Sequence, residues 1–449
     1  MKKKLLKSIS IICSAALVFS MAACGGKSGS DSDEKDSQEA SEAGSAEAEE
    51  AEEAEASTGA AGDTEITVMI PSWGEPSQEL LDEFTSETGI GVTMEIVGWD
   101  DIRDKVSIAA VGETAPADVL EVDWSWVGEF GAADWLEPVE MTDEEIEGMP
   151  TVSSFMYNSD VVAVPYSNDY RMAYYNTVQF NAAGVPEAAG TWDELIEQCK
   201  QIKEAGVCDY PIGCILSATE ATTTSLFWFT LSGFGDFFND DNSINKENLT
   251  ASLTALNGLV EDGLIDPASL SMTDVEVEDK LTSGDVCFEV STTNLVGKVN
   301  NEEYSSVIGE VAATLIPGNG STITSASYAL PEGIGISKYS ENKDAALQFV
   351  QWYTSADTQT ALYKELGNIP TQTEALENLV TEGLIDEDLG NVMIDQSAYI
   401  ESPFPNGIPT WYAEMSNAIY NNVNQMVAGS LTPQEACAKI SDKVDELNQ

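Results

Sequence analysis

From residue 64 onward, apolar and polar positions alternate in short strand-like runs separated by helix-like runs. Residues 65–70 alternate around Ile66, Val68 and Ile70, which predicts a strand, and the apolar side chains that follow recur at helical spacing until Gly89. The pattern then repeats, with strands predicted over 92–97 and 117–122 and a helix over 101–111. Short strands that alternate with helices of this length predict an α/β fold built on doubly wound, mostly parallel sheets.

Each of these three predicted strands is followed by tryptophan and a carboxylate. The residues are Trp73 with Glu75, Trp99 with Asp100, and Asp123 with Trp124 and Trp126. In open α/β sheets the ligand crevice lies beyond the carboxyl ends of the strands, so we expect these side chains to meet at one edge. Flat aromatic rings cover the C–H faces of a pyranose, and carboxylates accept hydrogen bonds from its hydroxyls. The pattern therefore favours sugar recognition, with expected ligand contacts from Trp73, Glu75, Asp123, Trp124 and Trp126.

The first 23 residues have the pattern of an export signal. Four lysines are followed by an apolar stretch over 9–19 that is too short for an ordinary membrane span. Residues 21–25 (MAACG) resemble a bacterial lipobox, which predicts that Cys24 is acylated on its sulfur and becomes the mature N-terminus. Two or three acyl chains would hold the protein at a membrane. The alternative is ordinary secretion, with Cys24 left unmodified.

Residues 24–63 differ in composition from the rest of the chain. The segment 25–63 carries 13 acidic and 2 basic residues and contains no aromatic residue, Leu, Ile or Val. Such a sequence cannot bury enough apolar surface to offset the entropy of ordering, so it is predicted to be a disordered acidic tether.

Composition excludes several classes of function. The chain of 449 residues contains no histidine, which excludes Ser-His-Asp, Cys-His and His-ligated zinc chemistry. Its 78 acidic against 19 basic residues give a formal charge of -59, which argues against a nucleic-acid partner. The five cysteines beyond residue 24 are odd in number and lack CxxC spacing, so we expect neither a zinc site nor a disulfide framework. We predict buried free thiols, no metal and no cofactor.

Several short motifs occur in a characteristic order along the chain. They are ADV at 117–119, LEP at 136–138, VPY at 164–166, YYN at 174–176, TWDEL at 191–195, NKDAA at 342–346, GNIP at 367–370 and SLTPQEA at 430–436. Because these motifs occur in this order and follow a lipobox-like sequence, the chain resembles the extracellular solute-binding proteins of ABC importers, the family that includes maltodextrin-binding proteins. At the third strand end the order of Trp and Asp departs from the maltodextrin pattern, so the length and linkage of the sugar stay open.

The resemblance implies a two-lobe fold with the ligand held between the lobes and a hinge that closes around it. The first lobe would comprise 64–166 and 317–372, and the second 170–314 and 376–449. It also implies a binding protein without enzymatic activity. We expect a monomer, anchored by lipid at the outer face of the bacterial cytoplasmic membrane, that delivers a sugar or oligosaccharide to the permease subunits of an ABC transporter.

The same resemblance supplies site residues in the second lobe and near the crossings. Asp169 falls where maltodextrin binders place a carboxylate, and Arg171 would orient it or simply form an ion pair with it. Trp228 would be a stacking ring or a core residue. Trp411 would be an aromatic platform opposite Trp124. Loop residues that complete the set are Asn294 and Tyr328.

Two other functions stay open. A polyamine or other cation binder could use the same aromatic rings and carboxylates through cation–π contacts. A secreted glycosidase needs only two carboxylates, which this composition supplies in abundance.

Overall fold

The computed structural model describes residues 57–58, 64–320 and 325–449. Cys24 and the tether predicted over 24–63 lie outside the described residues, apart from Ser57–Thr58, whose backbone pairs with a strand. Among the described residues, no helix combines the length and apolar character needed to cross a membrane.

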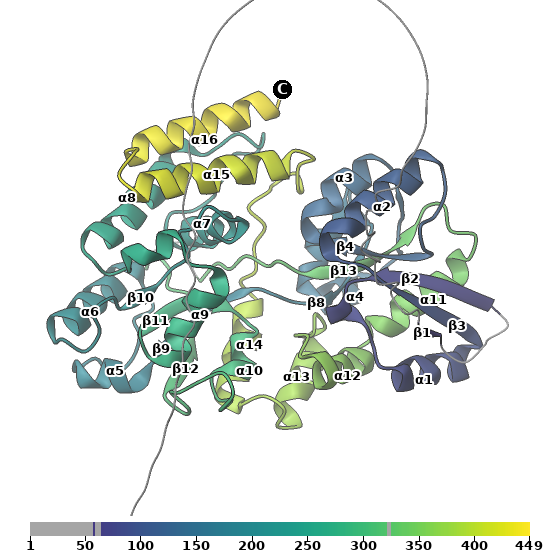
Figure 1. The fold of residues 1–449 in the computed structure, drawn as a ribbon, viewed down its shortest axis with the longest axis horizontal. Helices are drawn as coiled ribbons and strands as arrows, with labels where there is room; N and C mark the ends of the chain where they lie inside the picture. The colour runs from purple at the N-terminus through teal and green to yellow at the C-terminus, as the bar shows by residue number, and fades with distance from the viewer. Residues whose placement is uncertain (1–56, 59–63, 321–324) are drawn as a thin grey trace, which may run out of the picture. The chain divides into compact units, whose positions relative to one another are not determined.

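The first lobe is built on a sheet that contains seven strands among the described residues (Figure 1). The strands are β1 (Ser57–Thr58), β2 (Thr64–Ile70), β3 (Ile90–Ile96), β4 (Val119–Asp123), β5 (Leu136–Glu137), β8 (Val164–Ser167) and β13 (Glu332–Ser337). Strand β2 pairs in parallel with β3 and β4, whereas β13 runs antiparallel to β4, β5 and β8. A separate hairpin is formed by β6 (Met156–Tyr157) and β7 (Asp160–Val161).

Helices pack on this sheet through buried apolar side chains. They are α1 (Gln78–Thr88), α2 (Trp99–Val111), α3 (Val127–Ala132), α11 (Lys343–Tyr353) and α12 (Ala356–Leu366), whereas the short α4 (Asp143–Glu147) has no buried residue. Helix α1 begins where the Ser77 hydroxyl accepts the Leu80 N–H, and it ends at Gly89, whose φ of 75° is left-handed. The core on this side joins Phe84 of α1 edge to face with Phe349 of α11.

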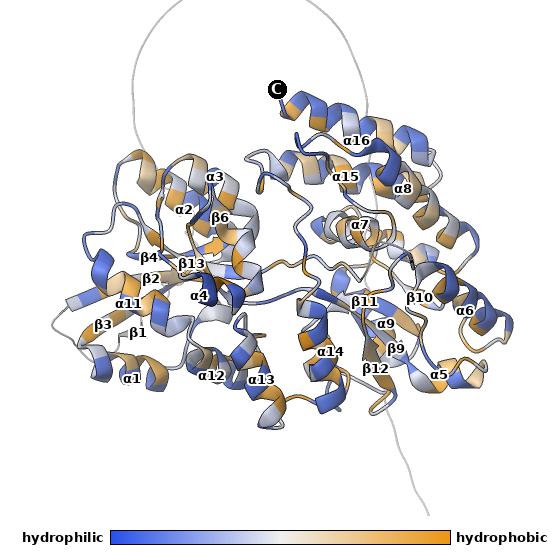
Figure 2. Ribbon diagram, turned by 180° about the vertical axis from the view of Figure 1, so that it is seen from behind, coloured by the Kyte–Doolittle hydropathy of each residue, from blue (hydrophilic) through white to orange (hydrophobic). Residues whose placement is uncertain are grey.

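The second lobe contains a four-stranded sheet in the order β10 (Ile212–Gly213), β11 (Phe288–Thr292), β9 (Arg171–Asn176) and β12 (Val311–Thr314). Around it lie α5 (Thr177–Ala182), α6 (Trp192–Glu204), α7 (Glu220–Gly233), α8 (Lys246–Glu261), α9 (Asp274–Ser283), α10 (Leu295–Lys298), α13 (Thr373–Thr381), α14 (Glu387–Ser397), α15 (Tyr412–Val427) and α16 (Pro433–Leu447). Hydrophobic and hydrophilic residues alternate along α15 and α16 (Figure 2), and the buried residues of α16 include Ile440 and Val444.

The chain passes between the two sheets more than once. Strand β8 of the first sheet is followed, after residues 168–170, by β9 of the second. The chain then returns through 315–331 to β13, and Ser327 in this segment pairs with Ile400, which follows α14. Each lobe is therefore assembled from segments that are separated in the sequence, while the exact lobe boundaries given above stay a prediction.

The predicted α/β class is confirmed, but the sheets are mixed rather than mostly parallel. Among the named strands of the described part of the chain, parallel pairing is confined to β2 with β3 and β4, and to β10 with β11. Strands β9 and β13 each enter their sheet from the opposite lobe, and both run antiparallel to the neighbours on either side. The βαβ pattern seen in the sequence accounts for the parallel strands β2, β3 and β4. It does not account for strands that enter a sheet from the opposite lobe.

Candidate ligand-binding cleft

A cleft of about 960 Å³ is lined by residues of both lobes. The first lobe contributes Trp99 and Arg103 from α2, and Asp123, Trp124, Ser125, Trp126 and Glu129 from the end of β4 and the helices that follow. The second lobe and the crossing segments contribute Asp169, Arg171, Glu220, Ala221, Thr224, Asp274, Leu330, Thr410, Tyr412, Ala413, Glu414 and Tyr420. The volume suits a small molecule, such as a single ring or a few linked rings.

The carboxyl end of β4 supplies two of the aromatic rings. Asp123 closes the strand, and its carboxylate accepts hydrogen bonds from the backbone N–H of Ser125, at 2.8 Å, and from the Ser125 hydroxyl. This turn starts a short 3-10 helix over Trp124–Trp126. Trp126 packs against Trp99, with ring centroids 5.0 Å apart, so two of the three predicted strand ends place tryptophan in one cleft.

Trp124 is held between Tyr412, which opens α15 of the second lobe, and Tyr328, in the segment that leads into β13. Its ring lies edge to face on Tyr412, with centroids 4.8 Å apart, and on Tyr328, at 5.4 Å. The Tyr412 hydroxyl and the Ser416 hydroxyl both donate to the carboxylate of Glu220, at the start of α7. The position of Trp124 is therefore coupled to α7 and α15 of the second lobe.

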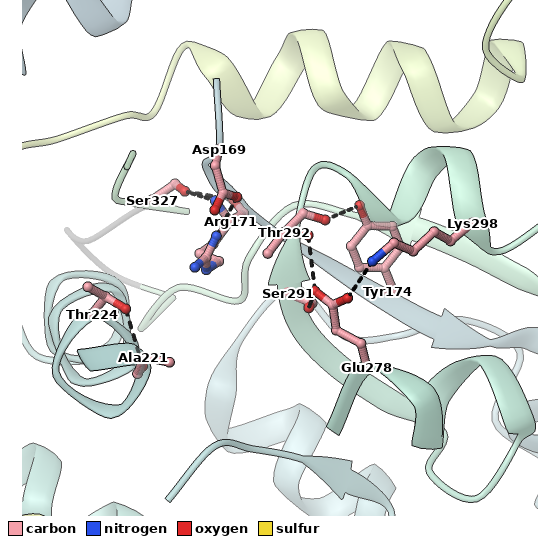
Figure 3. A network of polar contacts seen from close by, with 10 residues as sticks. All are labelled: Asp169, Arg171, Tyr174, Ala221, Thr224, Glu278, Ser291, Thr292, Lys298 and Ser327. Atoms are coloured by element: carbon pink, nitrogen blue, oxygen red, sulfur yellow. Dashed lines mark hydrogen bonds and ion pairs between the residues drawn. The ribbon is translucent and has the colours of Figure 1, made fainter. Parts of the chain in front are cut away.

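An ion pair lies where the chain enters the second lobe. Arg171 Nη1 is 2.5 Å from Asp169 Oδ1, and the Arg171 side chain is only 11% exposed (Figure 3). The backbone of Arg171 is fixed by Ser327, whose hydroxyl donates to the Arg171 carbonyl at 2.6 Å and accepts from its N–H at 3.1 Å. Burial raises the pKa of Asp169, and the Arg171 guanidinium opposes that shift. The predicted neighbours are thus paired, and both face the cleft.

The chain has only two arginines, and both line this cleft. Arg103 reaches in from the first lobe and pairs with Glu129 through Nη2 at 2.7 Å and Nε at 2.8 Å. The other 17 basic residues of the chain are lysines, and none of those in the described residues lines the cleft. Arginine offers planar, paired N–H donors that lysine lacks, so its placement here marks the cleft as a site of directed hydrogen bonding.

Carboxylates outnumber these two cations. Among the described residues, the cleft lining contains Asp123, Glu129, Asp169, Glu220, Asp274 and Glu414. Burial raises the pKa of Asp123 well above its ordinary value, and burial also raises the pKa of Glu220. These two carboxyls therefore keep a proton to higher pH than exposed ones and can donate as well as accept hydrogen bonds.

Six of the predicted site residues lie elsewhere than in the cleft lining. Trp73 is 43% exposed in a short 3-10 helix after β2, and Glu75 follows it, half-buried. Asn294 is exposed before α10, and Trp411 is half-buried before α15, against the hydrophobic core. Their contribution to binding stays a prediction.

The other two of these six are buried. Tyr328 is buried and packs edge to face against the ring of Trp124. Trp228 lines a separate apolar cavity of about 30 Å³ in the second lobe, where it stacks on Trp192. Helix α7 thus directs Trp228 into this apolar cavity, while Glu220, Ala221 and Thr224 of the same helix line the cleft, and a ligand contact by Trp228 stays a prediction.

Several cleft residues were not identified from the sequence. Tyr412, rather than the preceding Trp411, faces Trp124, and Arg103, Glu129, Glu220 and Asp274 lie on helices without a binding motif. The scarcity of arginine is the one sequence signal that could have pointed to Arg103. Within the described residues, no group of His, Cys, Asp and Glu has the arrangement needed to hold a metal ion.

Comparisons with known proteins agree with this architecture. The sequence profile of the family described as bacterial extracellular solute-binding protein matches residues 70–360. A probable amino-acid ABC transporter periplasmic-binding protein of Sinorhizobium fredii is 24% identical over 383 residues, which cover 81% of this chain and 84% of that protein.

Two solved structures of sugar-binding proteins share the fold. The maltose-bound MalE3 of T. maritima superposes with a TM-score of 0.70 at 21% identity, covering 86% of this chain and 100% of that chain. The sugar-binding protein MalE from Xanthomonas citri superposes with a TM-score of 0.74 at 18% identity, covering 86% of this chain and 97% of that chain. At these identities the superpositions establish the fold, and they confirm the predicted two-lobe architecture. Because the family profile spans well over half of the sequence, the chain belongs to the bacterial extracellular solute-binding protein family.

Proposed function

We propose that this protein captures a sugar or oligosaccharide in the cleft and delivers it to the permease subunits of an ABC importer. The observation that carries the proposal is the lining of the cleft, which combines aromatic rings from both lobes with two arginines, each ion-paired with a carboxylate. Apolar faces with a few placed polar groups are what a pyranose requires, because its C–H faces are apolar and its rim consists of hydroxyls.

In this proposal the two lobes contribute different chemistry to one site. Trp124 and Trp126 offer ring surface at the end of β4. Asp169 and Arg171 form an acceptor and a donor side by side, so one hydroxyl pair of the sugar could bind to both. Because the rings and the ion pair belong to different lobes, full contact requires the lobes to be closed around the ligand.

The solved relatives support the ligand class. The structure from T. maritima contains maltose, and that from Xanthomonas citri is described as a sugar-binding protein. The relative from Sinorhizobium fredii is named for amino-acid transport, so a free amino acid belongs in any ligand screen.

We further propose that Cys24 carries a lipid anchor and that residues 25–63 only space the lobes from the membrane. The support is the lipobox-like MAACG sequence and the acidic composition of the tether. Replacing Cys24 by Ala should release soluble protein whose affinity for ligand is unchanged. Continued membrane attachment of the variant would contradict the anchor, and a loss of binding would contradict the role of the tether as a spacer.

The central experiment is a ligand screen by thermal shift, followed by analysis of the ligand after incubation. Binding stabilises the folded state by mass action, so a saccharide that binds should raise the melting temperature. The glycan should be recovered unchanged, since we propose binding without turnover. Shortened glycan products would instead favour the glycosidase.

A cationic ligand is the second candidate, because one observation favours it. The cleft lining contains six acidic residues and two arginines, and it includes the aromatic residues Trp99, Trp124 and Tyr412, a combination that suits cation–π contact. In the same screen, a melting shift with spermidine or putrescine and none with any saccharide would select this function.

A further inference from the structure

Three thiols meet inside the second lobe, away from the cleft. Cys199 belongs to α6, Cys208 lies in the loop that follows this helix, and Cys287 immediately precedes β11. All three are buried, and each is a free thiol in the structure. Proposed ligand capture uses none of them.

Cys208 and Cys287 lie on adjoining segments of the chain, and their thiols influence each other's acidity. The backbone holds their two segments side by side. The Cys208 thiol donates to the carbonyl of Asp285 at 3.2 Å, and the N–H of Cys287 donates to the carbonyl of Pro211 at 3.1 Å. The Cys287 thiol also lies 3.4 Å from the Pro211 carbonyl oxygen. The two thiols therefore lie close together in the fold, although 79 positions separate them in the sequence.

The two thiols differ in acidity. The Cys287 thiol lowers the pKa of Cys208, whereas the Cys208 thiol and burial raise the pKa of Cys287. Cys208 is 7% exposed and Cys287 is fully buried. A thiolate is the attacking species in disulfide exchange, so Cys208, which has the lower pKa and the larger exposed fraction, is the better nucleophile of the two.

We infer that Cys208 and Cys287 form an oxidisable pair, which a small disulfide outside the cell converts into an intramolecular disulfide. In the first step the Cys208 thiolate attacks one sulfur of the small disulfide and releases one thiolate of that reagent. In the second step Cys287 gives up its proton and attacks the Cys208 sulfur, releasing the second thiol. The two cysteines are oxidised by two electrons, and the small disulfide is reduced to two thiols.

The bond would join the loop after α6 to the start of β11. Oxidation closes a long loop of the chain and so restricts the unfolded state, which stabilises the protein. We expect the melting temperature to rise by roughly 5–10 °C, and we expect ligand affinity to stay unchanged because the pair lies outside the cleft lining.

The test is to incubate the folded full-length protein with oxidised glutathione and examine it by mass spectrometry without reduction. The expected product has lost two hydrogen atoms, and its peptide map links the peptides that contain Cys208 and Cys287. The variants Cys208→Ser and Cys287→Ser should not form this product or gain stability, whereas Cys437→Ser, a buried thiol elsewhere in the lobe, should behave like the parent.

Three outcomes would overturn the inference. One is protein that stays fully reduced. Another is a link between Cys199 and Cys208. The third is a stable glutathione adduct on Cys208 that Cys287 does not resolve. If Cys287→Ser fails to fold, Cys208→Ser alone still decides whether the pair exists.

Discussion

Trp124 and Tyr412 pack edge to face, with ring centroids 4.8 Å apart and an angle of 80° between the ring planes. One ring follows a strand of the first lobe, and the other opens a helix of the second. Substituting either ring would therefore remove ring surface from the proposed site and would also remove a contact between the lobes.

Replacing Trp124 by Ala should weaken ligand binding by roughly ten- to hundred-fold. A well-buried aromatic contact contributes on the order of 1–3 kcal/mol, and each 1.4 kcal/mol is about tenfold in affinity. Titration calorimetry measures the effect. Trp352→Phe is the matched control, because Trp352 packs on Phe84 in the core of the first lobe. A folded Trp124→Ala protein with parental affinity would remove this ring from the site.

The same calorimetry can separate Tyr412 from Trp411. Because Tyr412 lines the cleft and Trp411 does not, Tyr412→Ala should lose at least tenfold in affinity, about 1.4 kcal/mol, whereas Trp411→Ala should lose less. If Trp411→Ala loses more affinity than Tyr412→Ala, the sequence-based expectation that Trp411 is the aromatic platform would hold instead.

Asp169→Asn should weaken binding by roughly 1.5–3 kcal/mol, because it replaces a charge-assisted hydrogen bond by a neutral one and leaves Arg171 without its ionic partner. Arg171→Lys should also lose affinity, since lysine keeps the charge but not the paired N–H donors. Lys246→Ala, which removes an exposed ion pair with Asp445, should change nothing. Equal affinity in all three variants would exclude the ion pair from the site.

Gly128→Ala should separate the lobes and so weaken binding. A Cβ at position 128 in α3 would lie 2.0 Å from the carbonyl oxygen of Ile408, in the segment that leads into α15. Overpacking of this kind typically costs about 1–3 kcal/mol. If the clash destabilises only the closed arrangement of the lobes, this corresponds to a loss of roughly ten- to hundred-fold in affinity. Small-angle scattering should show a larger radius of gyration.

The control for this change is Gly258→Ala, where an added methyl group in α8 meets no neighbour within 4 Å. That variant should be stabilised slightly, because alanine favours the helix over glycine. A Gly128→Ala protein that binds and scatters like the parent would show that the contact does not restrain closure.

Stability should fall as pH rises through the range from about 4.5 to about 8. Burial raises the pKa of Glu121 from 4.5 to about 8, so in this range the folded state keeps a proton that the unfolded state has released. The stabilisation is complete below about pH 4.5 and is lost by about pH 8, and each pKa unit corresponds to about 1.4 kcal/mol. Burial raises the pKa of the neighbouring Glu332 as well, which adds to the same trend.

Urea unfolding across this range measures the slope, and Glu121→Gln should reduce it. The exposed Glu140→Gln serves as control and should leave the slope unchanged. Identical slopes for the parent and Glu121→Gln would show that Glu121 is ionised in the folded protein.

The sequence predicts the first-lobe side of the cleft well and the second-lobe side only in part. Asp123, Trp124 and Trp126 follow a strand, and the end of a strand in this fold determines where the next side chains point. Trp411 and Tyr412 sit at the start of a helix, where successive side chains differ by about 100° in direction, so the sequence cannot decide which ring faces the ligand. Arg103 and Glu220 reach the cleft only through the docking of α2 and α7, which depends on contacts far apart in the chain.

The position of the two arginines has a practical consequence for spectroscopy. A protein labelled with ¹⁵N only at arginine would give side-chain signals from Arg103 and Arg171 alone, one from each wall of the cleft. The spectrum would contain no signal from the remainder of the chain to assign or subtract. Each lobe thus carries its own reporter, and titration of a ligand would show separately when it is engaged by each wall.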